Sequence, residues 1–192
     1  MRKIVLASTS RYRRELLDRL GLPFETDKPE TDETPQAGES PAATAMRLAI
    51  DKARAVAARH TDALIIGSDQ VASVGDERFG KPGSVARAIA QLRQMSGRAI
   101  TFHTAVCLLD TRTGEAPTLC VPTEVRFRVL NDDEIDRYVT RDMPLDCAGS
   151  AKSEALGITL LEHIRGDDPN ALVGLPMIAL CRLLRDAGVQ TI

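Results

Sequence analysis

Ala63-Leu64-Ile65-Ile66-Gly67-Ser68-Asp69-Gln70 is the stretch of sequence that decides the fold. Residues 63–67 carry no polar side chain, which predicts a short strand buried on both faces, as in the middle of an α/β sheet. Three polar residues follow, and we expect the strand to end at them. Ligands of open α/β sheets bind outside the carboxyl ends of the strands, so Asp69 is a candidate catalytic carboxylate. The alternative is a turn or helix-capping aspartate without a chemical role.

The composition predicts one domain, or one domain with two lobes. The chain has 192 residues and a hydrophobic fraction of 43%, enough for a sizeable core. A net charge of −2 argues against a general nucleic-acid or anionic-membrane binder. Aromatic residues make up 3% of the chain and Trp is absent, which argues against stacking platforms for single-stranded nucleic acid.

The cysteines and the N-terminal segment indicate a cytoplasmic protein. The four cysteines form no CxxC pair, which is typical of buried free thiols in a reducing compartment. No signal peptide and no apolar run of membrane-spanning length is expected. The cysteines are Cys107, Cys120, Cys147 and Cys181.

The beginning of the chain predicts a phosphate site. A strand over residues 3–7 leads into the hydroxyl loop Ser8-Thr9-Ser10 and then into a helix that ends near Gly21. The N-terminus of a helix offers unpaired N–H groups to an anion. Three arginines in the first turn, Arg11, Arg13 and Arg14, oppose the helix dipole and favour phosphate binding over a purely structural helix. Solvated arginines are the alternative, and a P-loop is excluded because GxxxxGK[ST] is absent.

Further candidate residues lie in the next segments. Glu33 belongs to an acidic loop between Pro29 and Pro35. Ser40 and Pro41 predict the start of a helix that runs to about residue 59, with Lys52 at the edge of its apolar stripe. Lys52 either extends to solvent or points into a cleft. Lys81 stands between Gly80 and Pro82, which fixes its backbone.

The second half of the chain predicts three helices and an antiparallel sheet with one wet face. The helices are expected over residues 84–95, after a capping box that begins at Asn131, and from Pro176 onward. Strands are expected over residues 99–109, 118–129 and 157–164, and a polar loop over 146–154. The side chains expected to face inward on the first and last of these helices are Val85, Ala88, Ile89, Leu92 and Met95, and Ile178, Leu180, Cys181 and Leu184.

The sequence resembles the Maf family of nucleoside triphosphate pyrophosphatases. The resemblance covers nearly the whole chain in the right order, and the opening motif together with the Asp69 segment is specific. The matching motifs are Leu6-Ala7-Ser8-Thr9-Ser10-Arg11-Tyr12-Arg13-Arg14, Thr31-Asp32-Glu33-Thr34, Ile66-Gly67-Ser68-Asp69-Gln70, Gly80-Lys81-Pro82, Ala148-Gly149-Ser150-Ala151-Lys152-Ser153-Glu154 and Val173-Gly174-Leu175-Pro176.

The resemblance implies a fold and a reaction. The expected fold is α/β: an elongated mixed β-sheet flanked by helices, with two lobes and a central cleft, in one Maf-like (ITPase-like) domain over residues 1–192. The expected reaction is hydrolysis between the α- and β-phosphates of a nucleotide, with a divalent cation (Mg, Mn or Co) as cofactor. The partner is a small-molecule nucleotide, with no nucleic acid or membrane, and a homodimer is possible.

The resemblance also implies residue roles. Asp69 matches the family's proton acceptor and would orient or deprotonate the attacking water. The expected catalytic residues are Asp69, Glu33 and Lys81, the phosphate-binding residues are Ser8, Ser10, Arg13 and Lys52, and the metal ligands are Glu33 and Asp69.

Three positions are expected to select the base: Tyr12, Gln70 and Glu154. They are similar to the family branch that acts on 7-methyl-GTP rather than the branch that acts on dTTP and UTP. A 7-methylguanine ring is cationic and favours an aromatic face and a carboxylate. The branch usually has Trp at the position of Tyr12, so the preference is expected to be softer. The alternative is that Tyr12 is a core aromatic residue on the helix stripe, with Leu16, Leu17 and Leu20.

The leading hypothesis is therefore a house-cleaning pyrophosphatase that converts 7-methyl-GTP to 7-methyl-GMP and diphosphate. A second hypothesis keeps the chemistry and changes the substrate to dTTP or UTP. A third is a nucleotide-binding regulator of cell division and septum formation, in which catalysis is incidental. The intact set of Asp69, Glu33 and Lys81 argues against a binder without activity.

Overall fold

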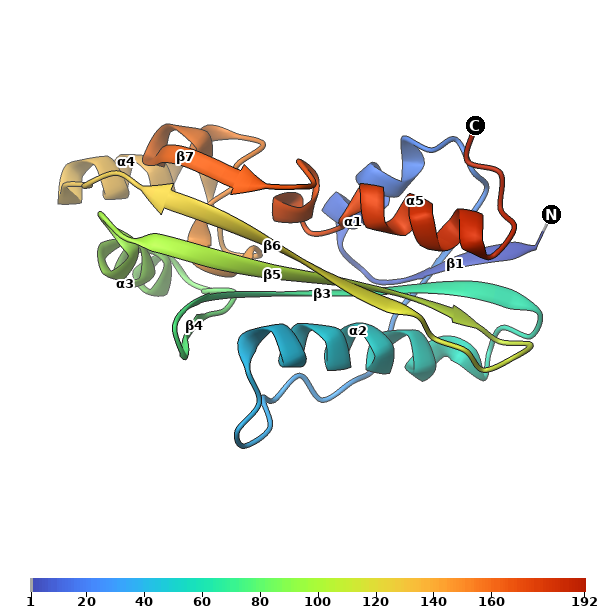
Figure 1. The fold of residues 1–192 in the computed structure, drawn as a ribbon. Coiled ribbons are helices and arrows are strands. Elements are labelled where there is room, and N and C mark those ends of the chain that lie inside the picture. Colours follow the sequence, from blue (N-terminus) through green and yellow to red (C-terminus); the bar gives the residue numbers. More distant parts are fainter. Residues whose placement is uncertain (1) are drawn as a thin grey trace. The chain divides into compact units, whose positions relative to one another are not determined.

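The computed structural model describes residues 2–192 and shows an α/β protein with a mixed, seven-stranded sheet flanked by helices (Figure 1). The strand order is β2-β1-β3-β5-β6-β7, with β4 paired to β3. The strands are β1 (Lys3–Ala7), β2 (Glu25–Asp27), β3 (Ala63–Val74), β4 (Glu77–Phe79), β5 (Ala99–Asp110), β6 (Thr118–Phe127) and β7 (Leu161–Gly166). The helices are α1 (Arg11–Asp18), α2 (Pro41–Ala57), α3 (Val85–Met95), α4 (Asp132–Asp142) and α5 (Met177–Asp186), with short 3₁₀ turns η1 (Ala148–Ser150), η2 (Leu156–Leu160) and η3 (Ala171–Val173).

The chain divides into two compact units. The first comprises Met1–Gln70, Thr104–Val121 and Asp168–Ile192, and the second comprises Val71–His103 and Pro122–Asp167. Boundaries between the units fall within β3, β5 and β6. Each unit is therefore built from segments that are distant in sequence. The expected cleft between two lobes stays a prediction.

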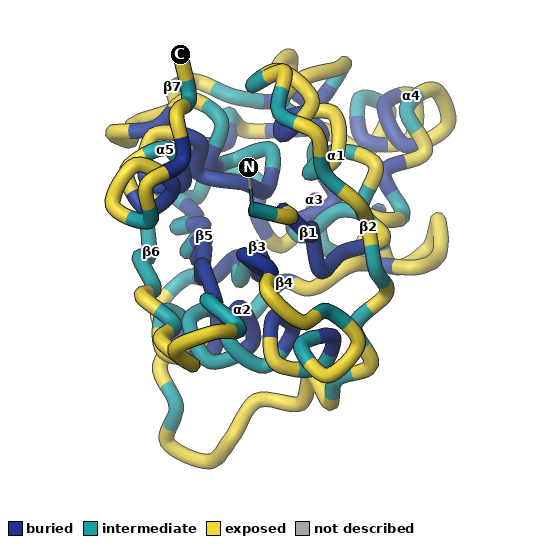
Figure 2. Tube along the Cα trace, turned by 90° about the vertical axis from the view of Figure 1, so that its right-hand side faces the viewer, coloured by how far each residue is buried: buried dark blue, intermediate teal, exposed yellow. Residues whose placement is uncertain are grey.

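In the first unit, β1, β2 and the start of β3 form the parallel part of the sheet, which helices cover on both faces. β1 pairs in parallel with β2 and with β3, with Lys3 opposite Ala63 and Leu6 opposite Ile66. Helices α1 and α5 cover one face and α2 covers the other (Figure 1). A view along the strands shows the buried sheet between these layers (Figure 2). Strands buried on both faces read as continuous apolar runs, and β1 and the start of β3 both do so.

Alternation along β1 and β3 decides which helix each side chain meets. Ile4 and Leu6 of β1 belong to the core formed with α1 and α5. In β3, Gly67 faces α2 so closely that a Cβ would lie 2.0 Å from the Ala49 carbonyl oxygen. Any other residue at position 67 would therefore push α2 away from the sheet.

The expected end of the central strand at Ser68 is wrong. β3 runs for 12 residues to Val74 without a break. Its polar stretch stays extended because each side chain finds partners on its own face: Ser68 and Gln70 on the side of η3, and Asp69 on the side of α2. β1 stops at Ala7 instead, so Asp69 lies beyond the stretch of β3 that pairs with β1.

The second unit contains the packed helices α3 and α4 and two antiparallel strand pairs. β3 pairs with β4 through Ala72 and Phe79, and β6 pairs with β7 from Thr123 opposite Gly166. The predicted capping box at Asn131 is confirmed at the start of α4, and Ser84, predicted as the first residue of a helix, is the N-cap of α3, where its side chain accepts from a backbone N–H. Each cap satisfies backbone donors that the first turn leaves unpaired.

Several predicted details are corrected. The strand expected over residues 157–164 begins at Leu161, because the chain before it closes into η2, with hydrogen bonds from the Ile158 N–H to the Ala155 carbonyl and from the Thr159 hydroxyl to the Leu156 carbonyl. Val85 of α3 and Ile178 of α5 were expected to face inward and are exposed. Val85 is the first residue of α3, ahead of the buried Ala88, and Ile178 lies on the outward side of α5 between the buried residues Met177 and Ala179.

The cysteines are all free, as predicted, although only Cys107 is fully buried. Burial raises the pKa of the Cys107 thiol. Cys181, expected to face inward, is half-buried. Among residues 2–192, no helix is long and apolar enough to span a bilayer.

Candidate active site

The loop after β1 forms a compact cradle of hydroxyl and amide groups. Ser8 turns the chain, with its N–H donating to the Leu6 carbonyl (2.9 Å), and its Oγ accepts from the Ser10 N–H (3.1 Å). Ser10 is the N-cap of α1, and its Oγ accepts from the Arg13 N–H at 3.4 Å. The first turn of α1 has no acidic residue. The N-terminus of α1 therefore presents donors and positive charge, as an anion site requires.

Lys52, Asp69 and Glu33 form an ion cluster in the first unit. The Lys52 ammonium lies 2.5 Å from Asp69 Oδ1 and 2.7 Å from Glu33 Oε1. Lys52 and Asp69 are each only 7% exposed, whereas Glu33 is exposed. Of the two fates expected for Lys52, the structure shows the inward one.

The burial of this cluster has a clear physical requirement. An unpaired buried charge costs several kcal/mol, so a buried lysine needs a carboxylate and a buried aspartate needs a cation. α2 supplies Lys52 from a stripe of alanines and β3 supplies Asp69, while Glu33 reaches in from the loop before α2. Lys52 therefore holds the carboxylates of Asp69 and Glu33 around its ammonium, and Glu33 is open to solvent.

Arg13 joins this cluster from α1. Its Nε donates to the Gly174 carbonyl at 2.8 Å, and the Ser68 hydroxyl donates to the same carbonyl at 3.1 Å. Burial lowers the pKa of the Arg13 guanidinium, while the charges of Asp69 and Glu33 raise it. Asp69 and Glu33 therefore act electrostatically on Arg13. The loop serines, the two cations and the two carboxylates all belong to the first unit.

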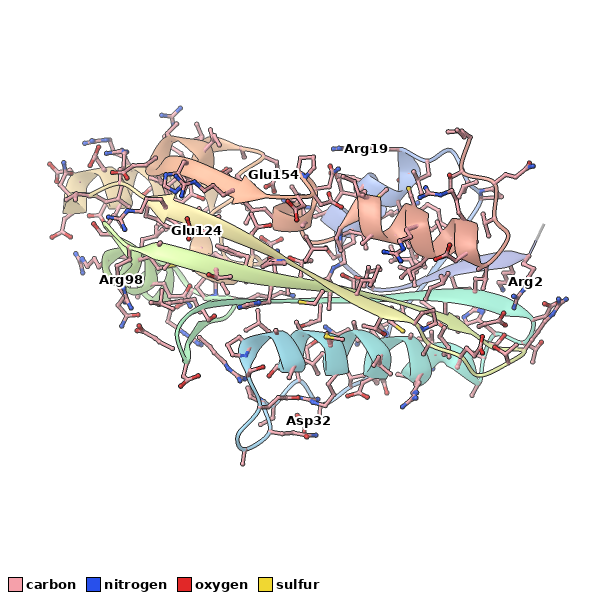
Figure 3. The ribbon with its side chains drawn as sticks, in the orientation of Figure 1. Arg2, Arg19, Asp32, Arg98, Glu124 and Glu154 are labelled. Atoms are coloured by element: carbon pink, nitrogen blue, oxygen red, sulfur yellow. The ribbon has the colours of Figure 1, made fainter. Side chains whose placement is uncertain are left out.

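The loop that carries Glu33 is anchored to α2 by Arg47. Arg47 donates to both oxygens of Glu39 (2.7 and 3.0 Å), to the Thr34 carbonyl (3.1 Å) and to Asp51 (3.3 Å). The hydrogen bonds from Arg47 to Glu39 lower the pKa of Glu39 to about 2. Asp32, labelled in Figure 3, accepts from the Thr34 N–H at 2.9 Å and closes the turn around Glu33. Sequence reasoning missed Arg47, although its spacing of four residues from Asp51 on a helix is a recognisable pairing signal.

Gln70 has structural partners on its own face of β3. Its Nε2 lies within 3.0–3.1 Å of the Thr104 hydroxyl and the carbonyls of Ala171 and Leu172. Because these groups accept hydrogen bonds there, the amide nitrogen of Gln70 is committed to holding η3. Its expected role in base selection stays a prediction, and the structure adds a role in positioning the segment that carries Gly174.

Tyr12 lies on the first turn of α1 and is half-buried. The Arg11 guanidinium lies 4.7 Å from the ring centroid, and its Nη2 donates to the Tyr12 hydroxyl at 2.8 Å. The Arg11 guanidinium thus makes a cation–π contact with this ring, and the expected role of Tyr12 in base selection stays a prediction. Leu16 and Leu17, further along the same helix, are the residues of α1 that are fully buried in the core.

Lys81 and Glu154 belong to the second unit, and their convergence with the cluster of the first unit stays a prediction. Both side chains are exposed. The backbone around Lys81 is held on both sides, because Gly80 accepts from the Gln91 side chain (3.1 Å) and the Gly83 N–H donates to Leu145 (3.0 Å). Glu154 comes two residues after the buried Lys152, at the end of the loop over residues 146–154.

The residues of the first unit suit a divalent cation shared with a phosphate ligand. Hard cations such as Mg²⁺ bind through one or two carboxylates together with phosphate oxygens. Glu33 and Asp69 both lie within 2.7 Å of the same ammonium nitrogen, so their carboxylates converge on one location. Within residues 2–192, no three His, Cys, Asp or Glu side chains gather into a centre made by protein alone. Because their carboxylates converge, Glu33 and Asp69 fit a cation that a phosphate ligand helps to coordinate.

Comparison with known proteins shows the family of the chain. The family model described as "Maf-like protein" matches residues 3–187. The chain belongs to the Maf family. It is 64% identical over 187 residues to the "7-methyl-GTP pyrophosphatase" of Aromatoleum aromaticum, covering 97% of this chain and 96% of the relative. It is 58% identical to the protein of the same name from Cupriavidus metallidurans (96% and 93% covered) and 57% identical to that of Thiobacillus denitrificans (98% and 94% covered).

Proposed function

We propose that this Maf-family chain hydrolyses 7-methyl-GTP between the α- and β-phosphates, releasing 7-methyl-GMP and pyrophosphate. The observation that carries the proposal is the cluster in which Lys52 pairs with Asp69 and Glu33, in the unit that also holds Arg13 and the serine cradle. The names of the relatives support the choice of substrate.

The phosphates would be bound at the start of α1. The hydroxyls of Ser8 and Ser10 and the N-terminus of α1 would supply neutral donors, and Arg13 and Lys52 would supply charge. Lys81 would stabilise the negative charge that builds on the departing pyrophosphate. Because Arg13 is tied to Gly174 through Nε, its guanidinium is held in one orientation before the substrate arrives.

Asp69 would orient the attacking water and accept its proton. In the substrate-free arrangement its Oδ1 accepts from Lys52. Phosphate oxygens of a bound triphosphate would compete for the Lys52 ammonium, which now occupies this carboxylate oxygen. Binding of the triphosphate would therefore release Asp69 for its role.

Charge balance supports a requirement for a divalent cation. The positive charges of Arg13 and Lys52 are offset by Glu33 and Asp69, whereas a triphosphate brings about four negative charges to the site. A bound Mg²⁺, Mn²⁺ or Co²⁺ would neutralise phosphate oxygens, with Glu33 and Asp69 as its protein ligands.

The base would be recognised by an aromatic face and a carboxylate. A 7-methylguanine ring is cationic and its N1–H and exocyclic amine are donors, so it suits Tyr12 and Glu154. An uncharged pyrimidine offers less to either group. We further propose that the enzyme works in the cytoplasm on a small-molecule nucleotide, without a nucleic-acid partner, as a monomer or homodimer.

Product analysis tests the reaction. Incubation of the purified chain with 7-methyl-GTP and Mg²⁺ is expected to give equal amounts of pyrophosphate and 7-methyl-GMP, measured by phosphorus NMR. Excess chelator is expected to stop turnover, and added Mn²⁺ or Mg²⁺ to restore it. Orthophosphate with a diphosphate product would overturn the proposed cleavage site, and full activity in chelator would overturn the role of the cation.

A further inference from the structure

Lys152 is a buried lysine in the second unit that the proposed reaction does not use. It is only 8% exposed. Its Nζ donates to the carbonyls of Asp142 (2.7 Å) and Met143 (3.2 Å), and Asp146 Oδ1 lies 3.9 Å away. These carbonyls end α4, where the last turn leaves acceptors unpaired and the helix dipole is negative. The ammonium is therefore held at the C-terminus of α4.

The backbone of Lys152 is fixed as firmly as its side chain. Its N–H donates to the hydroxyl of Tyr138, a buried residue of α4, at 3.0 Å. Its carbonyl accepts from the Ala155 N–H at 3.0 Å. A Cβ at Gly157 would lie 2.5 Å from that carbonyl oxygen, so the chain folds back tightly onto Lys152.

The segment before Lys152 is also held in place. Ser150 has no exposed surface, and its Oγ donates to Gln91 at 2.6 Å. Its φ of +51° is unusual for a residue with a side chain. Gly149 has a φ of +70°, and a Cβ there would lie 2.9 Å from the Phe102 ring. Backbone strain of this kind costs on the order of 1–3 kcal/mol and persists where the surrounding structure imposes it.

Glu154 lies inside the turn that these contacts close. It sits between Lys152 and Ala155, whose backbone groups are bonded to each other, and its own side chain is exposed. Figure 3 labels this glutamate on its loop. An exposed carboxylate on a fixed buried support is suited to ligand recognition, because little ordering is left to be lost on binding.

We propose that Lys152 is a positioning residue for base selection: by anchoring its loop to the C-terminus of α4, it sets the place of the Glu154 carboxylate. The inference rests on the proposed role of Glu154 in recognising the base. It adds that discrimination between bases depends on a residue that does not touch the nucleotide. Apart from Lys81, the residues proposed to bind phosphate and activate water belong to the first unit. The contacts described for the Lys152 side chain are with other residues.

The test is the selectivity ratio, defined as kcat/KM for 7-methyl-GTP divided by kcat/KM for GTP. Lys152→Met keeps the length of the side chain and removes the donors. It is expected to lower the ratio by roughly 5- to 10-fold, with a smaller loss of kcat/KM for GTP, whose neutral base has the same N1–H and amine donors without the ring charge. In a Glu154→Gln background, which has already lost the carboxylate, the same substitution is expected to leave the ratio unchanged.

A matched control uses the other end of α4. Asn131→Ala removes the N-cap of the same helix and is expected to lower the melting temperature without changing the ratio. If Lys152→Met does not fold, Tyr138→Phe removes only the hydroxyl that accepts from the Lys152 N–H, and a ratio lowered by roughly 2-fold or more is expected.

The outcomes separate this inference from the function on which it rests. A folded Lys152→Met or Tyr138→Phe protein with the parent ratio, beside a Glu154→Gln protein with a reduced ratio, overturns the inference alone. An unchanged ratio in Glu154→Gln overturns the proposed role of Glu154 and the inference with it, while hydrolysis to pyrophosphate would stand. A fall in the ratio for Asn131→Ala equal to that for Lys152→Met would assign the effect to general destabilisation.

Discussion

Asp69 shows how a candidate residue can lie in a different part of an element than the sequence predicts. The sequence singled it out as a carboxylate at the end of a buried strand, and the structure places it in the interior of β3, bonded to Lys52. The apolar run predicts the strand, but nothing in the local sequence shows that Lys52, 17 residues earlier, satisfies the carboxylate. A local hydrophobic pattern predicts that a strand ends at polar residues, because the pattern does not include polar partners on other elements.

Asp69→Asn tests the chemical role of this residue. Asparagine keeps the shape and removes the base, so kcat for hydrolysis of 7-methyl-GTP is expected to fall by about 10²-fold or more, with a smaller change in KM. Steady-state kinetics on parent and variant measure this. Thermal melts of both proteins serve as the control, because the substitution also removes a buried ion pair. A variant with normal turnover would return Asp69 to a purely structural role.

At the scale of elements, caps and stripes were the most predictable features. The N-caps Ser40, Ser84 and Asn131 and the limits of β1 follow from side-chain types and spacing alone. η2 was not predictable in this way, because its turn depends on the close approach of Gly157 to the Lys152 backbone. Asp168 was missed for a similar reason: it accepts from the Ile178 N–H (2.6 Å) at the start of α5 from ten residues away.

The N-terminal end of β1 carries a pH-dependent contribution to stability. Arg2 lies just before this strand and forms paired hydrogen bonds of 2.5 Å with Asp110, at the end of β5 (Figure 3 labels Arg2). They lower the pKa of Asp110 to about 2 from an ordinary value of 3.8. The folded state thus favours the ionised carboxylate. Its contribution is fully present above the unfolded pKa and is lost as the pH falls through about 2.

Arg2→Met is expected to lower the free energy of unfolding at pH 7. The difference from the parent should shrink below pH 3.8, the ordinary pKa of Asp110, and vanish near its folded value of about 2. Urea titrations at several pH values measure this. Arg93→Met removes an exposed pair with Asp132 and serves as the control, with little expected effect at any pH. A difference between Arg2→Met and the parent that is constant from pH 7 to 2 would contradict the linkage.

At the scale of the whole molecule, the fold class and the family were predictable, and the assembly of the site was predictable in part. The order of motifs along the chain carried the resemblance, and the matched family model confirms it over residues 3–187. Glu33, Lys52 and Asp69 come together as expected of a site, although they are far apart in sequence. Their meeting depends on the packing of α2 against Gly67 of β3 and on the hydrogen bonds that hold the Glu33 loop to α2, which are tertiary features that residue patterns do not contain.

Selectivity among nucleotides tests the proposed function most directly. The measurement is kcat/KM for 7-methyl-GTP, GTP, dTTP and UTP on the purified parent chain, at one Mg²⁺ concentration, with release of pyrophosphate as the readout. A charge-assisted contact with a cationic base is worth about 1–3 kcal/mol, so 7-methyl-GTP is expected to exceed each of the others by roughly 10- to 100-fold. A parent enzyme that turns over dTTP or UTP more efficiently than 7-methyl-GTP would contradict the proposed substrate and the roles given to Tyr12 and Glu154.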